Sequence, residues 1–464
     1  MHQTADRRAS APCARLSCAA LLALGLLAIA PAEALAEAGG ADDVASASAL
    51  EAPQTWAVHG QFTSVAQYHP AFHAAYSGPN SLDDGSRGST TNDVTLYLGV
   101  RPWKGAEIWL DPEIDQGFGL SDTLGAAGYT NGEGSKVGRS TPYFRVHRWF
   151  LRQTIDLGGE VQKVDADQLQ LAGSRTADRL VFWVGKFNVT DVFDNNKYAH
   201  DPKNDFLNWS VIDTGSYDYA ADAWGYTYGV ATEWYQGDWT TRFGLFGLSD
   251  TPNSKKLDGT LHQFQYDGEI EHRHQIWGQP GAVRLSAFLT RGRMGSYEQA
   301  VEQAAATGLP ADIAAVRRWA DRGGFSLTAE QQLRDGLGVF LRAGWAEGDK
   351  EADDFTDIDR TVAAGLSLTG ARWGRADDSV GLAVAANAPT RQLKQFLAAG
   401  GLGILIGDGK LVNSGPEQIL ETYYSLAMFK LAHLSFDYQF INNPAYNRDR
   451  GPVSVLTARV HAQF

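Results

Sequence analysis

The sequence predicts an all-β protein: a closed, antiparallel transmembrane β-barrel of sixteen strands with small helices in its loops. Three observations predict it. Segments of alternating apolar and polar residues recur from Trp56 to the last residue, the connections between them alternate between short and long, and the chain ends on an aromatic residue inside such a segment. The mean hydropathy of −0.28 does not contradict a membrane protein, because a barrel places its apolar residues at every second position.

Residues 1–36 are expected to be a secretory signal peptide rather than part of the fold. Arginines precede the apolar stretch "LSCAALLALGLLAIA" (16–30), and "ALA" (34–36) fits a cleavage site. Both cysteines of the chain, Cys13 and Cys18, lie in this leader, so a disulfide, a catalytic thiolate or a cysteine-ligated metal is excluded from the rest. Residues 37–55, rich in Ala, Ser and acids, are expected to form a flexible periplasmic segment before the barrel of residues 56–464.

Sixteen segments follow the period of two that is typical of strands with two different faces. They are 56–69, 92–102, 105–115, 143–157, 180–187, 226–236, 238–249, 262–276, 281–293, 324–334, 336–347, 358–370, 378–388, 419–430, 432–442 and 452–464. The net charge of −14 argues against a nucleic-acid partner, whose phosphates require a basic surface.

Connection lengths indicate the orientation of the barrel. Those after even-numbered segments are mostly tight, and those after odd-numbered segments are mostly long. Outer-membrane barrels have short periplasmic turns and long extracellular loops, so both chain ends are expected on the periplasmic side. Residues 158–179 break the pattern, being long where a short turn is expected. Two short helices are expected, in 295–308 and 310–324, from their capping-box, proline and glycine signals.

The C-terminal segment explains why the chain can end on an aromatic residue. In a closed barrel the last strand pairs with the first, so no edge is left open. Phe464 and its alternates are expected to face lipid, while Arg459 and His461 face the lumen. The terminal Phe464 is also expected to be read by the outer-membrane assembly machinery. A soluble sandwich is the rival fold, but sandwiches do not alternate their loop lengths.

Alternation also assigns the lumen-facing side chains, because a charge facing lipid near the midplane costs about 2–4 kcal/mol. The phase of segment 143–157 slips near Val146, which leaves Arg145 unassigned. The predicted lumen-facing residues are Glu107, Trp109, Asp111, Glu113, Arg148, Arg152, Glu269, Glu271 and Arg273.

These residues predict a water-filled pore, since sixteen to eighteen strands leave an aqueous channel. A lining with both signs of charge, amides and aromatic faces suits neutral sugars, and the arginines are expected to give some anion preference. The alternative is a mixed polar lumen that selects nothing. Loops 116–142 and 188–225 are the candidates for folding inward.

Catalytic and metal-binding patterns are weak. His69 and His73 have a metal-like spacing only on a helix, and they lie at a strand end. Asp111 and Glu113 could form a glycosidase pair, but they are better explained as lumen lining. The sequence predicts no enzyme activity, no cofactor and no metal site.

Several stretches resemble the bacterial carbohydrate-selective outer-membrane porins of the OprB type. They are "DPEIDQGFGLS" (111–121), "FLRQTIDLGG" (150–159), "DYAADAWGYTYG" (218–229), "WGQPG" (277–281), "TRGRMGSY" (290–297) and "FDYQFINNPAYNRDRGPVSV" (436–455). The resemblance implies a sixteen-stranded barrel in the outer membrane of a Gram-negative bacterium, which passes glucose and related mono- and oligosaccharides by facilitated diffusion through an eyelet. Carried onto this sequence, the eyelet candidates are Glu113, Arg148 and Arg152, with Trp224 in a matching stretch.

Two alternatives remain at this stage: a general or weakly anion-selective porin, and an outer-membrane enzyme built on a barrel. The expected partners are small sugars, outer-membrane lipid and the assembly machinery. Both a single barrel and a homotrimer fit the pattern.

Overall fold

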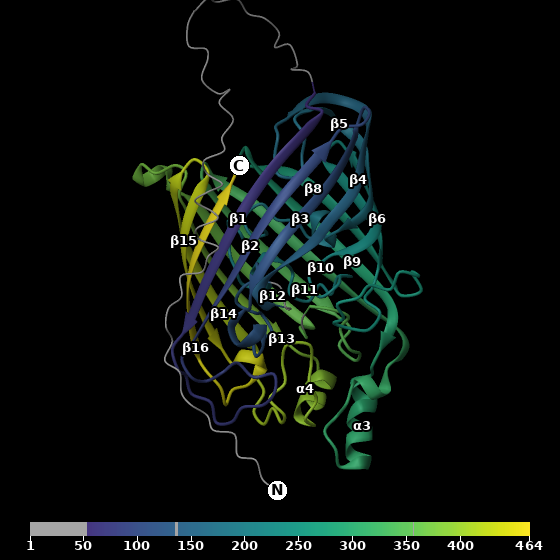
Figure 1. The fold of residues 1–464 in the computed structure, drawn as a ribbon, viewed down its shortest axis with the longest axis vertical. Coiled ribbons are helices and arrows are strands. Elements are labelled where there is room, and N and C mark those ends of the chain that lie inside the picture. The colour runs from purple at the N-terminus through teal and green to yellow at the C-terminus, as the bar shows by residue number, and fades with distance from the viewer. Residues whose placement is uncertain (1–52, 135–137, 356) are drawn as a thin grey trace, which may run out of the picture. The chain divides into compact units, whose positions relative to one another are not determined.

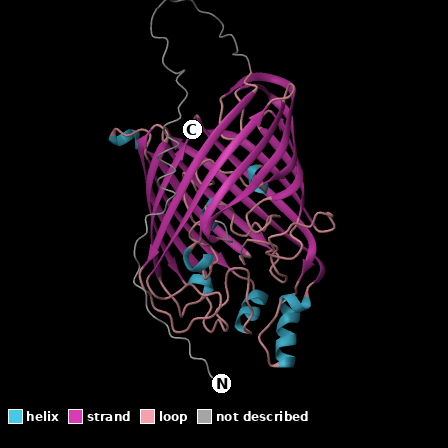
Figure 2. Ribbon diagram, viewed as in Figure 1, coloured by secondary structure: helices cyan, strands magenta, loops and turns pink. Residues whose placement is uncertain are grey.

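A computed structural model describes residues 53–134, 138–355 and 357–464. These residues form a closed barrel of sixteen antiparallel strands in which every strand pairs with its neighbours in sequence and β1 pairs with β16 (Figures 1 and 2). The strands are β1 (Trp56–His69), β2 (Arg87–Val100), β3 (Ala106–Gly117), β4 (Arg139–Val164), β5 (Gly173–Phe187), β6 (Thr227–Gln236), β7 (Trp239–Gly247), β8 (Phe264–Ile276), β9 (Gln279–Met294), β10 (Arg318–Arg334), β11 (Leu337–Ala346), β12 (Arg360–Thr369), β13 (Ser379–Ala388), β14 (Glu417–Phe429), β15 (Ala432–Asn442) and β16 (Val453–Gln463). Each predicted segment corresponds to one strand. The predicted signal peptide and most of the segment 37–55 lie outside the described residues.

The long loops and the helices α3 (Tyr297–Thr307) and α4 (Arg391–Ala398) gather at one end of the barrel, and short turns join the strands at the other (Figure 1). Within the described part of the chain, no helix has both the length and the apolar character needed to cross a bilayer. The remaining helical turns are η1 (Leu120–Thr123), η2 (Val189–Asp191), α2 (Trp209–Ile212), η3 (Ala314–Val316), η4 (Gly370–Trp373) and η5 (Pro444–Tyr446).

The chain end is part of the sheet. The backbone N–H of Phe464 donates to the carbonyl of Gly60 at 3.0 Å, and the N–H of Gly60 donates to the carbonyl of Phe464 at 3.0 Å. A Cβ at Gly60 would lie 2.5 Å from Cζ of Phe464, so glycine lets the terminal ring lie over β1. The barrel is therefore closed without an open edge at its first strand.

The two faces of the wall differ as the alternation predicts. On β2, Leu96 and Leu98 are exposed on the outer face, whereas Thr95 is buried. On β16, Arg459 and His461 are each 1 % exposed and point inward, while Phe464 is 56 % exposed. The outer face is thus apolar and the inner face polar, which is the pattern of a barrel in a lipid bilayer.

The long connection predicted at 158–179 is the end of a long hairpin. β4 extends to Val164 and β5 begins at Gly173, with register shifts around Gly158. The predicted helix in 295–308 is confirmed as α3, with the Ser296 side chain accepting from the N–H of Gln299 and Gly308 in the left-handed region. The helix predicted in 310–324 is wrong: only the turn η3 forms, because residues from Arg318 onward pair with β9.

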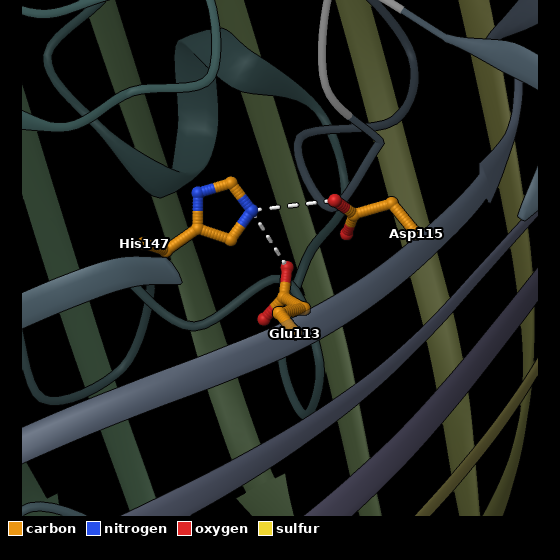
Figure 3. Close-up of side chains that lie close together, drawn as sticks. All are labelled: Glu113, Asp115 and His147. Carbon is orange, nitrogen blue, oxygen red and sulfur yellow. Dashed lines mark hydrogen bonds and ion pairs between the residues drawn. The ribbon is translucent and has the colours of Figure 1, made fainter. Parts of the chain in front are cut away.

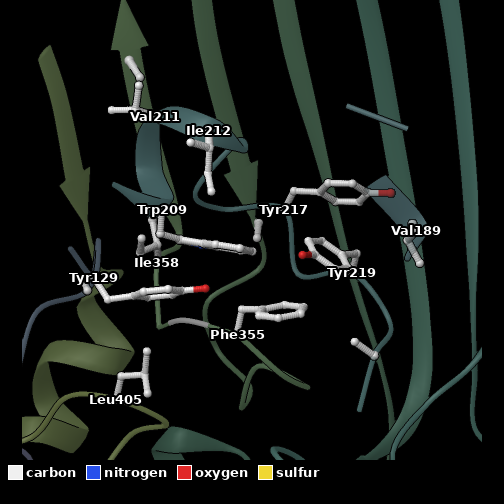
Figure 4. Packing of buried hydrophobic residues seen from close by; sticks show 14 of the residues in the cluster. Tyr129, Val189, Trp209, Val211, Ile212, Tyr217, Tyr219, Phe355, Ile358 and Leu405 are labelled. Atoms are coloured by element: carbon white, nitrogen blue, oxygen red, sulfur yellow. The ribbon is translucent and has the colours of Figure 1, made fainter. Parts of the chain in front are cut away.

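The apolar core lies inside the barrel, where inward-facing side chains of the wall pack against the loops. Two loops fold into the lumen, 118–134 after β3 and 188–226 between β5 and β6; we refer to the second as the inner loop. The indole of Trp209 stacks on the rings of Phe355 at 4.8 Å and Tyr129 at 5.1 Å between ring centroids (Figure 4). Aromatic stacking therefore joins the inner loop to the neighbouring loops.

One contact between outer loops predicts a pH-dependent stability. Asp357, 2 % exposed, accepts a hydrogen bond from the N–H of Ile404 at 2.7 Å, and burial raises the pKa of Asp357 to about 7 from 3.8. Between these two values the folded protein holds a proton that the unfolded chain releases, so this group destabilises the fold as pH rises through the interval.

We therefore expect Asp357→Asn to raise the melting temperature in detergent at pH 8, by at least about 2 °C, and to change it little at pH 5. Circular dichroism of the β signal measures both. The exposed Asp349 in the same loop provides the control, because Asp349→Asn removes a carboxylate that is not buried. An equal effect of Asp357→Asn at both pH values would contradict the assignment.

Candidate functional site

A cavity of about 390 Å³ lies inside the barrel, between the wall formed by β1–β4 and the two inward loops. We call it the lumen cavity. Its polar and aromatic lining includes Gln61, Tyr97, Glu113, Asp115, Tyr129, Glu133, His147, Arg148, Asp191, His200, Asp201, Lys203, Asp213, Trp224 and Tyr226. Of the ten pore residues predicted from the sequence, Glu113, Arg148 and Trp224 line it.

Arg148 links the wall to the inner loop. Its Nε and Nη2 donate to the two carboxylate oxygens of Asp191 at 2.8 and 2.7 Å, and its Nη1 lies 3.6 Å from Oδ2 of Asp111. Asp191 closes the turn η2, whose first N–H groups are capped by Asn188. The guanidinium also lies 4.9 Å from the ring centroid of Tyr226. A bidentate pair of this kind fixes both the position and the orientation of the charge.

A bulge in β4 explains the predicted slip near Val146. Asp111 is paired with Arg148 and Pro112 with Val146, so β4 carries one extra residue, His147, at this point. The guanidinium of Arg145, which the sequence left unassigned, stacks over the ring of Trp224 at 3.4 Å. Bulges re-aim side chains beside functional sites, and this one turns both His147 and Arg148 toward the lumen cavity.

A second group of predicted residues faces inward but lies outside the cavity lining. Nη2 of Arg152 donates to Oε2 of Glu107 at 2.5 Å and to the carbonyl of Leu169 at 2.7 Å. Nε1 of Trp109 donates to the same oxygen of Glu107 at 3.1 Å, and Asp111 is fully buried. These contacts attach the β4–β5 hairpin to the wall. Because Glu107, Trp109, Asp111 and Arg152 do not line the lumen cavity, their role in the pore stays a prediction.

The third group lies on the wall formed by β6–β10. Nη1 of Arg242 donates to Glu269 at 2.6 Å and to Glu271 at 2.9 Å, and Nη1 of Arg273 donates to Glu271 at 2.7 Å. Oε2 of Glu269 also accepts from the backbone N–H of Asp194 at 2.9 Å. This charged network therefore holds the inner loop through the backbone of Asp194. Its members do not line the lumen cavity.

Lys203 is a cavity residue that sequence reasoning missed. It forms an ion pair with Glu133 and lies 3.9 Å from Asp93, which joins the two inward loops and β2. Burial alone would lower the pKa of Lys203, but Asp93 and Glu133 raise it well above its usual range. A loop has no period that assigns its side chains, and the only signal was the density of Asp, Asn, Gly and aromatic residues in 188–225.

The charges around the cavity do not support the expected anion preference. Two cationic side chains, Arg148 and Lys203, face six carboxylates among the described lining residues. These carboxylates belong to Glu113, Asp115, Glu133, Asp191, Asp201 and Asp213. A lining with this excess favours cations over anions.

Comparisons with known proteins identify a matching family model and similar solved structures. A family model described as "Carbohydrate-selective porin, OprB family" matches residues 80–464. The high-pH structure of Pseudomonas putida OprB is similar, with a TM-score of 0.67 and 15% identity over 88% of this chain and 94% of that chain, which shows the fold. The outer-membrane channel DcaP of Acinetobacter baumannii aligns with a TM-score of 0.48 and 10% identity over 88% of this chain and 97% of that chain. No curated protein matches the chain in sequence.

Proposed function

The chain belongs to the OprB family of carbohydrate-selective porins, and we propose that sugars cross its barrel through the lumen cavity, with Glu113, Arg148 and Trp224 at the constriction. Its family and fold are those of outer-membrane porins, which are channels rather than enzymes. We infer that it performs no chemistry on the molecules that it passes.

The observation that carries this proposal is the pairing of fixed opposite charges across the cavity. The wall supplies Glu113 and Arg148, and the inner loop supplies Asp191 and Lys203. A sugar presents many hydroxyls that both donate and accept, so carboxylates and cationic donors around one cavity can replace part of its hydration shell. Each contact is weak enough to break, which permits passage rather than tight binding.

Trp224 supports the same proposal from the aromatic side. Its indole Nε1 donates to the hydroxyl of Tyr143 at 3.2 Å, and Arg145 covers one face of the ring. The side chain is thereby held rigidly beside the cavity, where an aromatic surface can contact the apolar face of a sugar ring.

Planar-bilayer recordings test this function. We expect an ion current that glucose or maltose reduces in a dose-dependent manner, and liposome swelling that depends on which mono- or disaccharide is supplied. A current unaffected by any sugar would identify a general porin instead. Hydrolysis of a lipid or glycoside without any current would identify an enzyme.

We also propose that Phe464 is the residue recognised by the outer-membrane assembly machinery and that the apolar outer face contacts lipid. Phe464 is exposed at the end of the barrel where β1 begins, and we expect its ring to be available to a partner before β1 and β16 pair. Phe464→Ala should lower the amount of folded barrel in the outer membrane, as measured by its resistance to unfolding in detergent gels.

A further inference from the structure

Three side chains with metal-binding atoms converge in the lumen cavity (Figure 3). Nε2 of His147 lies 3.3 Å from Oε1 of Glu113 and 3.3 Å from Oδ2 of Asp115. One such atom from each residue lies within 4.8 Å of the other two. We propose that Glu113, Asp115 and His147 bind a divalent first-row transition-metal ion inside the pore, a site that the sequence analysis did not predict.

The local fold explains why these three residues meet. Glu113 and Asp115 are two positions apart on β3, so both carboxylates project from the inner face. A regular β4 would alternate His147 and Arg148 between the two faces. The bulge between Val146 and Arg148 instead brings His147, which is 2 % exposed, to the inner face beside the carboxylates.

The spacing suits ligands around an ion better than a direct ion pair. A charged N–H···O bond is normally about 2.7–2.9 Å long, and the single Nε2–H of His147 cannot point at two carboxylates at once. Zinc lies about 2.0–2.2 Å from nitrogen and oxygen ligands, which places neighbouring ligand atoms of a tetrahedral site about 3.4 Å apart. The two 3.3 Å separations therefore match a shared metal ion.

The donor set indicates the class of ion. One imidazole nitrogen with two carboxylate oxygens suits zinc, manganese and similar ions, whereas calcium and magnesium prefer oxygen ligands alone. Three protein ligands leave at least one coordination position open toward the cavity, where water or a solute can bind. The site is therefore expected to exchange its ion with the water in the pore.

Surrounding residues hold the ligands in place. The hydroxyl of Thr95 donates to Oε2 of Glu113 at 2.5 Å, which leaves Oε1 directed at His147. The ring of Tyr226 stacks on His147 with 4.4 Å between centroids. Such contacts orient metal ligands. Nδ1 of His147 has no hydrogen-bond partner among the described residues. This holds whether Nε2 binds a metal ion or a carboxylate, so Nδ1 does not distinguish a metal ligand from an ion-paired histidine.

An ion at this position would change conduction. It would offset the charge of two of the carboxylates that line the lumen cavity and occupy space next to Arg148 and Trp224. We therefore expect bound metal to reduce the current carried by cations.

The test uses the purified, detergent-solubilised barrel with Zn²⁺ as the probe, after treatment with a chelator. Isothermal titration calorimetry at pH 7.5 should show one saturable site, and His147→Gln and Asp115→Asn should each weaken it at least about 100-fold. The matched control is His461→Gln, which removes another buried lumen histidine and should bind Zn²⁺ like the wild type. In bilayers, Zn²⁺ should reduce the wild-type current, and the chelator should restore it.

Calcium supplied at the same concentrations should not compete. Absence of a saturable zinc site, or equal affinity in the wild type and both ligand variants, would overturn the proposal and leave an ion-paired His147. Zinc binding is measured here without sugar, so its failure would leave sugar passage untouched, and a failure of sugar passage would leave the metal site untouched.

Discussion

Replacing Arg342 by methionine is expected to release the inner loop and enlarge the pore. Arg342 on β11 is fully buried, and its Nη1 donates to Oδ2 of Asp194 at 2.6 Å. Its Nη2 donates to the carbonyls of Ala199 and Ile212 at 2.7 and 2.8 Å. One guanidinium thus fixes three points of the loop that crosses the lumen. Methionine leaves the Asp194 carboxylate buried without its cation, which costs about 3–5 kcal/mol.

The measured result should be a larger single-channel conductance and a weaker dependence of the current on added sugar. The barrel wall should persist, because its strands pair through backbone hydrogen bonds that do not involve this side chain. A difference in gel mobility between unheated and heated samples would show that the barrel has folded.

Two further variants make the result interpretable. Arg291→Met removes an arginine whose pair with Asp321 is half exposed, and such pairs contribute only about 0–1 kcal/mol, so conductance should not change. The double variant Arg342→Met with Asp194→Asn removes both charges and should recover part of the lost stability, because the two residues are directly coupled. An unchanged conductance in folded Arg342→Met would refute the role of this contact.

The wall of the barrel could be predicted because its physics is periodic. Lipid outside and water inside force a period of two, and the strands show it except where the bulges of β4 interrupt it. The prediction failed where a local signal resembled a helix: Pro310 and Gly323 fit helix ends, but the turn η3 has no side-chain cap, and Gly323 lies in β10, which pairs with β9 from Arg318 onward. The sequence predicts segments 143–157 and 180–187 with a long connection. β4 and β5 extend into that connection, which was not predicted because register shifts between Asp156 and Val161 interrupt the alternation.

The candidate site could be predicted only in part, for a different reason. The alternation of side chains places Arg148 and Arg152 on the same face of one strand. It does not show which of the two the inner loop approaches. The structure separates them, since Arg148 meets Asp191 of that loop and Arg152 meets Glu107 of the wall. Lys203 lies in the loop itself, where no period exists. The position of a folded loop depends on long-range contacts such as that of Arg342.

Because Arg148 and Arg152 contact different parts of the barrel, their alanine variants are expected to differ. Arg148→Ala removes the cation that holds Asp191 and that we place at the constriction. Hydrogen bonds to charged groups contribute about 1.5–3 kcal/mol, and 1.4 kcal/mol corresponds to tenfold in affinity. The concentration of glucose or maltose that halves the current should therefore rise about tenfold or more. The reversal potential in a salt gradient should shift toward greater cation preference, because Asp111 and Asp191 lose their counter-charge.

Arg152→Ala is the matched control, with the same chemical change four residues along the same strand. Its guanidinium contacts Glu107 and the carbonyl of Leu169; Leu169 lines the lumen cavity, but Arg152 and Glu107 do not. It should leave the half-blocking sugar concentration within about twofold of the wild type, a difference under about 0.5 kcal/mol, although the hairpin it supports should become less stable. Sugar block that weakens equally in both variants would mean that the constriction lies nearer the periplasmic turns. Block that weakens in neither would remove Arg148 from the sugar path altogether.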